Sequence, residues 1–208
     1  MVLAISGYAG SGKDTLADEL IKKNLSFPTT KYAFASALKE TVSSLTGVPL
    51  NFFNDRDKKD SPLIDFPIKN LDSFSTHVNT FMDGEFKLLN KKPHHTPRSL
   101  AILLGSTMRS INPHYWVNKT ILDIGNGYGK LSIITDLRYR SELSELRNRY
   151  GNDLVSIRIN RYDSKSKDGS ERDLDNTPFD IVLENNGTMD ELVNKCLNAL
   201  ISRGATLG

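Results

Sequence analysis

The stretch Val2–Thr15, VLAISGYAGSGKDT, decides the expected fold of the chain. It opens with a short apolar run, Val2–Ser6, which is typical of a central parallel strand covered on both faces. The motif that follows, Gly7–Lys13, fits the GxxxxGK pattern, and residues spaced for one face of a helix come after it. A strand, a glycine loop and a helix in this order predict phosphate binding, because loop N–H groups and the helix N-terminus point at the anion.

Nucleoside triphosphate binding at this loop is therefore the main functional expectation. Lys13 is expected to carry a mobile positive charge toward the β and γ phosphates. The loop departs from the usual pattern, because Asp14 stands where a hydroxyl would ligate Mg²⁺ and Thr15 comes one place later. The metal would then be held through water or with the help of Thr15. The expected ATP-binding residues of the loop are Ala9, Gly10, Ser11, Gly12, Lys13, Asp14 and Thr15.

Composition excludes several classes of protein. The chain has 208 residues, of which 38% are hydrophobic and 25% charged, enough for one domain with a buried core. A net charge of +2 argues against a strongly basic nucleic-acid binder, and the single cysteine, Cys196, argues against a disulfide framework. No apolar run approaches the ~20 residues that a membrane helix needs. We expect a cytoplasmic protein whose partners are small molecules, neither nucleic acid nor a membrane.

Strand and helix patterns alternate along the rest of the chain. Strands are expected at residues 31–35, 131–135, 154–159 and 179–183, and helices at 37–45, 97–110 and 113–123, after a cap at Ser141, and after a capping box at Thr188. This alternation predicts an α/β fold in three layers, a central parallel sheet with helices on both faces.

Two segments break the alternation. Residues 48–97 hold five of the eight prolines and six of the nine phenylalanines, which predicts an ordered but irregular insertion on the substrate side. Residues 161–178 are too polar to form a core and are expected to act as a lid over the site.

The helix expected at 97–110 carries two arginines on one side. Arg98 and Arg109 flank Gly105 at helical spacing, so they could line a cleft in which Gly105 leaves space for a nucleotide. The alternative is an ordinary solvated helix face. The only tryptophan, Trp116, follows on the next helix, and a lone tryptophan is more often a core anchor than a ligand platform.

A second group of candidate residues follows the apolar strand at 131–135. Asp136 stands at the carboxyl end of that strand, where open α/β sheets bind ligands, and it would hold Mg²⁺ directly or through water. Arg138 beside it suits a phosphate, because a guanidinium offers paired donors and stays charged. From Arg138 to Arg161 there are six arginines and three acids, the positive balance that transfer between two anionic nucleotides requires.

Taken in order, several segments resemble the bacteriophage-type deoxynucleoside monophosphate kinases. They are GYAGSGKDTLAD, DRDKKDSPL, TPRSLAILLGSTMRSINPHYWVNK, IITDLRYRSELSELR and DIVLENNGTMDELVNKC. The resemblance implies a P-loop kinase fold and transfer of the ATP γ-phosphate to a deoxynucleoside 5′-monophosphate with Mg²⁺, a step of DNA precursor synthesis. It also implies a homodimer.

The same resemblance assigns roles to individual residues. It implies that Lys13, Arg138 and Arg161 are catalytic. It also implies that Asn185-Asn186-Gly187 is the turn beside the adenine, with Asn186 and Gly187 among the ATP-binding residues. The residues implied to meet or adjoin the monophosphate are Arg98, Arg109, Trp116, Asp136, Arg138 and Glu142. The lid departs from the family pattern, because Asp168-Gly169-Ser170-Glu171 lacks the expected histidine.

Two alternative functions stay open from the residues alone. One is another small-molecule P-loop kinase, such as a dephospho-coenzyme A kinase, which would share the loop and the lid. The other is a P-loop ATPase with no small acceptor, which would hydrolyse ATP unprompted or with a macromolecular partner.

Overall fold

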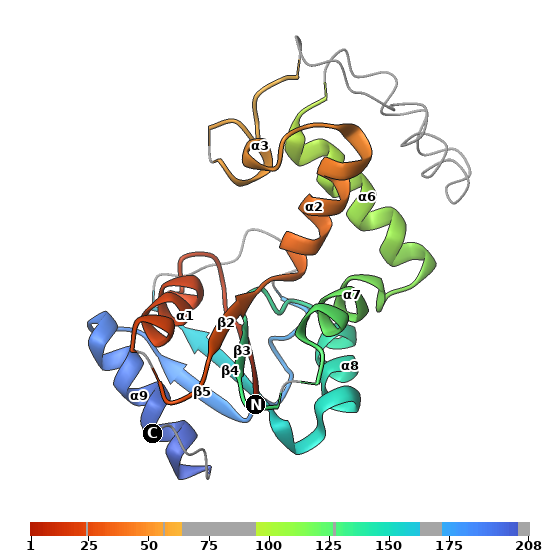
Figure 1. The fold of residues 1–208 in the computed structure, drawn as a ribbon. Coiled ribbons are helices and arrows are strands. Elements are labelled where there is room, and N and C mark those ends of the chain that lie inside the picture. Colours follow the sequence, from red (N-terminus) through yellow and green to blue (C-terminus); the bar gives the residue numbers. More distant parts are fainter. Residues whose placement is uncertain (24, 56, 64–94, 127, 163–171, 204–208) are drawn as a thin grey trace. The chain divides into compact units, whose positions relative to one another are not determined.

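The computed structural model describes residues 1–23, 25–55, 57–63, 95–126, 128–162 and 172–203, and it contains a five-stranded sheet (Figure 1). All neighbouring strands are parallel, in the order β2-β3-β1-β4-β5. The strands are β1 (Val2–Ser6), β2 (Thr29–Tyr32), β3 (Leu131–Ile134), β4 (Leu154–Asn160) and β5 (Ile181–Glu184). The predicted parallel α/β sheet is confirmed.

Burial along each strand follows its place in the sheet. All residues of the central strand β1 are buried, because helices cover both faces of the sheet there. The edge strand β5 alternates buried and exposed residues instead. The apolar run at Val2–Ser6 therefore identified the central strand correctly.

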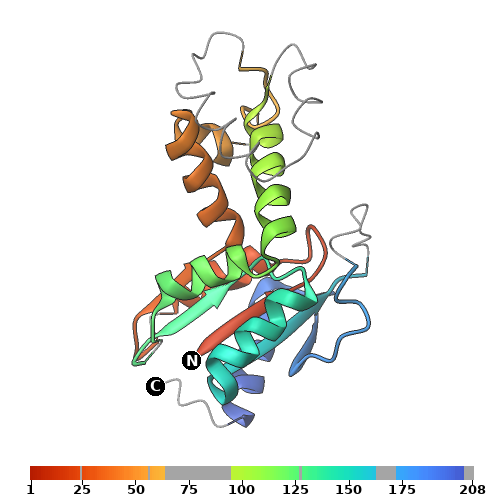
Figure 2. The same cartoon turned by 90° about the vertical axis from the view of Figure 1, so that its right-hand side faces the viewer.

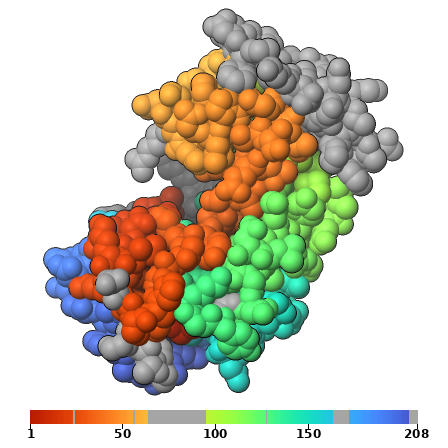
Figure 3. Space-filling view, viewed as in Figure 1, coloured from red at the N-terminus to blue at the C-terminus, as the bar shows by residue number. Residues whose placement is uncertain are grey.

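The helices of the described residues are α1 (Lys13–Lys22), α2 (Phe34–Thr46), α3 (Leu50–Asn54), α6 (Pro97–Ile111), α7 (Tyr115–Ile124), α8 (Arg140–Tyr150) and α9 (Met189–Ser202), with a 3₁₀ turn at Gly151–Asp153. Helices α1 and α9 pack side by side on one face of the sheet, and their surfaces adjoin in Figure 3. Helix α8 and the sheet-side part of α7 cover the other face (Figure 2). None of the helices described combines the length and the apolar character that crossing a bilayer requires.

One apolar cluster fills the layer between the sheet and the α1–α9 face. Leu3 and Ile5 of β1 meet Leu16 and Leu20 of α1 there, and Cys196 of α9 lies in the same cluster. All five residues are fully buried. The prediction that Cys196 lies within the buried stripe of its helix is confirmed, and burial raises the pKa of its thiol to about 12.

The chain divides into two units. The first comprises residues 1–34 and 117–208 and contains the sheet, and the second comprises residues 35–116 with α2, α3 and α6. Most of the expected insertion at 48–97 lies outside the described residues, as do the expected lid positions 163–171. The insertion and the lid therefore stay predictions.

Several expected boundaries were wrong by a few residues. Ala35, expected in a strand, lies in α2, because that helix begins at Phe34, whose N–H donates to Asp136 Oδ1 at 2.8 Å. Ser141 does not cap the following helix, which begins at Arg140. The short helix α3, inside the expected irregular insertion, was not predicted. The capping box at Thr188 is confirmed.

Candidate active site

The glycine loop between β1 and α1 folds into a tight turn that ends in the helix. The N–H of Ser11 donates to the Tyr8 carbonyl at 3.1 Å, and Gly12, the N-cap of α1, has φ of +99°. The Lys13 ammonium donates to the carbonyls of Gly7 and Tyr8, the latter at 2.8 Å. The lysine of the motif thus lies over its own loop, at the amino end of a helix whose partial positive charge favours anions.

Two residues that directly follow other strands donate hydrogen bonds to the carbonyls of the loop. The Asn185 side chain, 6% exposed, donates from Nδ2 to the Ser11 carbonyl at 2.9 Å. Arg161, just after β4, donates from Nη1 to the Gly10 carbonyl at 3.1 Å. The structure therefore brings the predicted residue Arg161 to the loop.

The turn predicted to lie beside the adenine, Asn185–Gly187, also adjoins the loop. Its contact with the loop comes from Asn185, whereas the Asn186 side chain accepts from the N–H of Tyr162 at 3.0 Å. Asn186 and Gly187 are exposed. Of the three residues, the sequence analysis assigned sites to Asn186 and Gly187 and missed the one that supports the loop.

Asp136, the carboxylate predicted to hold the metal, lies just beyond the carboxyl end of β3 and close in the chain to a contact with Asp14. Asp14 Oδ1 accepts from the Thr135 hydroxyl at 2.8 Å, which joins the first turn of α1 to the residue before Asp136. Asp136 Oδ1 holds the N–H of Phe34. Thr15, the residue after Asp14, is exposed. The contact between Asp14 and Thr135 thus joins the first turn of α1 to the segment that carries Asp136, and the metal site itself stays a prediction.

Glu142 caps the helix that follows Arg138. Its carboxylate, 3% exposed, accepts from the backbone N–H groups of Arg138 at 2.9 Å and of Tyr139 at 3.0 Å. A glutamate at this position of a helix satisfies donors that the helix itself leaves unpaired. In the structure Glu142 fixes the backbone of the exposed residue Arg138, and its direct contact with a substrate stays a prediction.

The sequence analysis missed a cluster beside the loop that centres on a buried arginine. Arg158 of β4 is 8% exposed and donates to Ser6 Oγ at 3.0 Å and to Asp175 Oδ1 at 2.7 Å. Asp175 Oδ2 also accepts from the Tyr8 hydroxyl at 2.7 Å. This hydrogen bond, together with burial, raises the pKa of Tyr8. The pair of Arg158 and Asp175 is separated by 17 residues, and no local pattern marks it.

In the second unit, Arg98 at the start of α6 forms an ion pair. Its guanidinium donates through Nε and Nη2 to the carboxylate of Asp60, with Nη2 3.1 Å from Oδ2. This hydrogen bond lowers the pKa of Asp60. The Arg98 N–H also donates to the Lys59 carbonyl at 2.9 Å, so both partners belong to the segment DRDKKDSPL. An anionic substrate at Arg98 would have to share its guanidinium with Asp60.

The space expected at Gly105 is not there. A Cβ at Gly105 would lie 3.0 Å from Leu38 Cδ2, so the glycine lets α6 and α2 pack closely and opens no cleft. Trp116 is 1% exposed, and its Nε1–H donates to the Gly105 carbonyl at 3.3 Å. The tryptophan is therefore a core anchor in this structure, which favours the first of its two interpretations. Arg109 of α6 is partly buried.

Comparison with known families decides the class of the chain. Residues 64–196, more than half of its length, match the model of a family described as "Deoxynucleotide monophosphate kinase". The chain belongs to this family. It is thus an ATP-dependent kinase that transfers a phosphate to a deoxynucleoside monophosphate.

Comparisons with individual proteins add little. No curated protein sequence matches the kinase significantly. Among solved structures, a mutant APS kinase from Mycobacterium tuberculosis has a TM-score of 0.45 at 10% identity, over 96% of each chain. Shikimate kinase from Aquifex aeolicus has 0.44 at 14% identity, over 98% of each chain. A hexameric APS kinase from Thiobacillus denitrificans has 0.48 at 13% identity, over 98% of this chain and 29% of that one.

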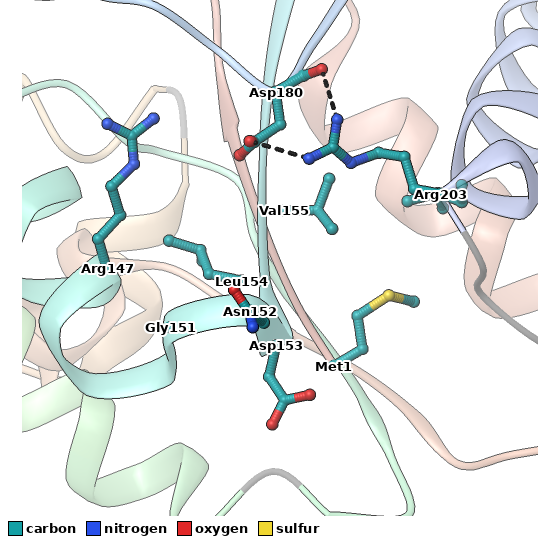
Figure 4. A pocket seen from close by; sticks show the side chains of 10 residues that line it. Met1, Arg147, Gly151, Asn152, Asp153, Leu154, Val155, Asp180 and Arg203 are labelled. Atoms are coloured by element: carbon teal, nitrogen blue, oxygen red, sulfur yellow. Dashed lines mark hydrogen bonds and ion pairs between the residues drawn. The ribbon is translucent and has the colours of Figure 1, made fainter.

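The kinase also has a pocket of about 620 Å³ away from the glycine loop. It lies at the amino end of the sheet, where Met1 precedes β1 and Leu154 begins β4 (Figure 4). Arg203 donates there to the carbonyl and the carboxylate of Asp180. Ligands of open parallel sheets bind at the carboxyl ends of the strands, so this pocket is at the wrong edge for the phosphoryl transfer site.

Proposed function

We propose that the kinase seats the triphosphate of ATP on the glycine loop and passes the γ-phosphoryl group to a deoxynucleoside 5′-monophosphate at the carboxyl edge of the sheet. The observation that carries this proposal is the loop itself, with Lys13 at a helix N-terminus and Arg161 and Asn185 on its carbonyls. The bond between the γ-phosphorus and the β–γ bridging oxygen breaks. A bond from an oxygen of the monophosphate to the same phosphorus forms, giving ADP and the deoxynucleoside diphosphate.

Charge neutralisation and alignment account for catalysis in this proposal. The acceptor is already an anionic phosphate, so no protein base has to remove a proton. The Lys13 ammonium, which lies on the carbonyls of Gly7 and Tyr8, would turn to the β and γ oxygens when ATP binds. Arg138 and Arg161 would offset the charge that spreads over the transferring group. Glu142 supports this arrangement by fixing the backbone of Arg138.

Mg²⁺ fits the residues at the end of β3. Mg²⁺ usually takes one or two carboxylates, several waters and the substrate phosphates, so it needs no cage of protein ligands. Asp136, with one oxygen on the Phe34 N–H, and Asp14, bonded to Thr135, would hold the ion or its waters, with Thr15 beside them. When bound, the ion would neutralise part of the charge of the phosphates.

The monophosphate side of the site rests on the family resemblance. Arg98 and Arg109 of α6 would bind the substrate phosphate and its surroundings, with residues 48–97 as the substrate-side insertion. Of the predicted lid, residues 161–178, the part 172–178 is anchored through the buried Leu174 and through Asp175, so a lid role stays a prediction for the earlier residues alone. The ion pair with Asp60 keeps the Arg98 guanidinium in one place before substrate arrives. Trp116 supports α6 and does not contact the substrate in this proposal, because its side chain is buried. The homodimer stays a prediction.

A coupled assay of ADP release tests the proposal. We expect ADP release that depends on an added deoxynucleoside monophosphate, with ribonucleotides, dephospho-coenzyme A and no acceptor as the comparison arms. Lys13→Ala should lower kcat by about 10²–10³-fold, the size of effect seen when one preorganised charge-stabilising donor is lost.

Lys22→Ala is the matched control for this variant. Lys22 lies on the same helix and is 68% exposed in an ion pair with Glu19, so its loss should leave kcat unchanged. Near-normal turnover in Lys13→Ala, or ADP release that ignores the acceptor, would contradict the proposal.

A further inference from the structure

The cluster of Tyr8, Arg158 and Asp175, in which the arginine is buried, joins three parts of the first unit. Tyr8 is the second residue of the glycine loop, Arg158 belongs to β4, and Asp175 lies on the segment 172–180. Asp175 accepts from both of the others at 2.7 Å, once on each carboxylate oxygen. Hydrogen bonds to an ionised carboxylate are about twice as strong as neutral ones, so the two contacts fix the Asp175 side chain firmly.

The Arg158 guanidinium also lies over the Tyr8 ring. Its guanidinium carbon is 4.8 Å from the centroid of that ring and 6.0 Å from the Phe179 ring. The side chain is only 10% exposed, so its charge needs the Asp175 carboxylate as a partner. The arginine, the tyrosine and the aspartate therefore form one unit, in which removal of any member leaves the others less well held.

The segment that carries Asp175 is itself anchored. Leu174 is fully buried, and the N–H of Asp175 donates to the Arg172 carbonyl at 3.0 Å. Asp173, two residues earlier, accepts from the N–H of Arg140 at 2.7 Å, and its carbonyl accepts from Arg140 Nε at 2.8 Å. The same short segment thus holds the loop through Tyr8 and the start of α8, just after Arg138.

Tyr8 connects this cluster to the reacting groups through its backbone. Its carbonyl accepts both from the Lys13 ammonium at 2.8 Å and from the N–H of Ser11 at 3.1 Å. A shift of Tyr8 therefore moves the turn that shapes the loop, and with it the carbonyl on which Lys13 lies before ATP binds. Tyr8 is thus held by Asp175 through its hydroxyl and contacts Lys13 through its carbonyl.

We propose that Tyr8, Arg158 and Asp175 are positioning residues for phosphoryl transfer, which hold the glycine loop in its phosphate-binding shape through the Tyr8 hydroxyl. The inference rests on the proposed seat of ATP on this loop and names residues outside the GxxxxGK motif that the seat depends on. It requires that the cluster changes ATP binding and turnover while the affinity for the monophosphate stays the same.

The test compares Tyr8→Phe and Asp175→Ala with the unchanged kinase. Tyr8→Phe keeps the ring under Arg158 and removes only the hydroxyl. We expect a rise of about tenfold in the Kd of ATP, measured by titration calorimetry without acceptor, from one charge-assisted hydrogen bond. The KM of the deoxynucleoside monophosphate should stay within about twofold. Tyr128→Phe, at an 83% exposed tyrosine, is the matched control and should change nothing.

The double variant separates a coupled cluster from independent contacts. If the hydroxyl acts through Asp175, the Kd of ATP in Tyr8→Phe/Asp175→Ala should be close to that of Asp175→Ala alone. A Tyr8→Phe variant with the ATP Kd and kcat of the unchanged kinase would overturn the inference, as would fully additive effects. Should Asp175→Ala not fold, Tyr8→Phe alone decides.

The Lys13→Ala variant separates this inference from the proposed function. If Lys13→Ala loses turnover and Tyr8→Phe behaves normally, the seat of ATP stands and the positioning role is wrong. If Lys13→Ala keeps its turnover, the seat of ATP itself is wrong, and the positioning role fails with it.

Discussion

Two glycines of the loop allow a matched test of how the loop is held. Gly10 and Gly12 both have a positive φ, +78° and +99°, so an alanine at either position is strained. They differ in what a side chain would meet. A Cβ at Gly10 has no neighbour within 4 Å, whereas a Cβ at Gly12 would lie 2.7 Å from Asn185 Nδ2. The difference between the two alanine variants isolates the contact with Asn185.

The magnitudes follow from these surroundings. The left-handed conformation costs an alanine about 1–2 kcal/mol, which is the expected loss of unfolding free energy for Gly10→Ala. Gly12→Ala would also push the Asn185 amide off the Ser11 carbonyl, where it donates at 2.9 Å. A buried amide that loses its partner costs about 1–3 kcal/mol more. We therefore expect Gly12→Ala to lose about 2–5 kcal/mol in total.

The single cysteine provides the assay. Cys196 is fully buried in the unit that contains the loop, so its rate of alkylation in a urea series reports the unfolding of that unit. If Gly12→Ala and Gly10→Ala lose the same free energy, the Asn185 contact contributes nothing and the reasoning is refuted. Asn185→Ala in the Gly12→Ala background gives a second check, because the two losses should then be far from additive.

Two further predictions concern groups away from the loop. Hydrogen bonds from Ser156 and the charges of Arg203 and Arg147 outweigh burial and lower the pKa of Asp180, so Asp180→Asn should lower the unfolding free energy at pH 7 by about 1–3 kcal/mol. A carboxyl whose pKa is lowered by folding stabilises the fold at pH values above its unfolded pKa of 3.8, and this stabilisation is lost as the pH falls through the folded pKa. In urea unfolding at a series of pH values, the difference in unfolding free energy between Asp180→Asn and the unchanged kinase should therefore shrink below pH 3.8. The thiol of Cys196, with its pKa raised to about 12, should resist iodoacetamide at pH 8 in the folded kinase and react once urea unfolds it, and rapid labelling of the folded kinase would contradict its burial.

The features that the sequence predicted well are local ones. The buried run at Val2–Ser6, the glycine loop and the capping box at Thr188 each involve residues within a few positions of one another. Their geometry is set by neighbours in the chain, so the pattern of residue types suffices. Cys196 was placed correctly for the same reason, because the apolar period of its helix marks the buried side.

The features that were missed depend on contacts across the chain. The start of α2 is fixed by Asp136, which is 102 residues away from Phe34. The spacing of Arg98, Gly105 and Arg109 indicated a common side of a helix, but it could not show that Leu38 fills the space at Gly105. Asp175 lies in a polar stretch with no feature that distinguishes it from its neighbours, although its position is fixed by Tyr8 and by a buried arginine.

The residues that hold the glycine loop share one property that explains both the success and the failure. Thr135, Arg161 and Asn185 are each the first residue after a strand, β3, β4 and β5 in turn. They contact Asp14, the Gly10 carbonyl and the Ser11 carbonyl. In a parallel sheet all strands end at the same edge. The first residue after β3, β4 or β5 therefore lies near the glycine loop, which follows β1 at that edge. The predicted ends of these three strands were each wrong by one residue, and an error of that size hides such a rule. With strand ends located to the residue, the amino-acid sequence alone would identify Thr135 and Asn185 as partners of the loop.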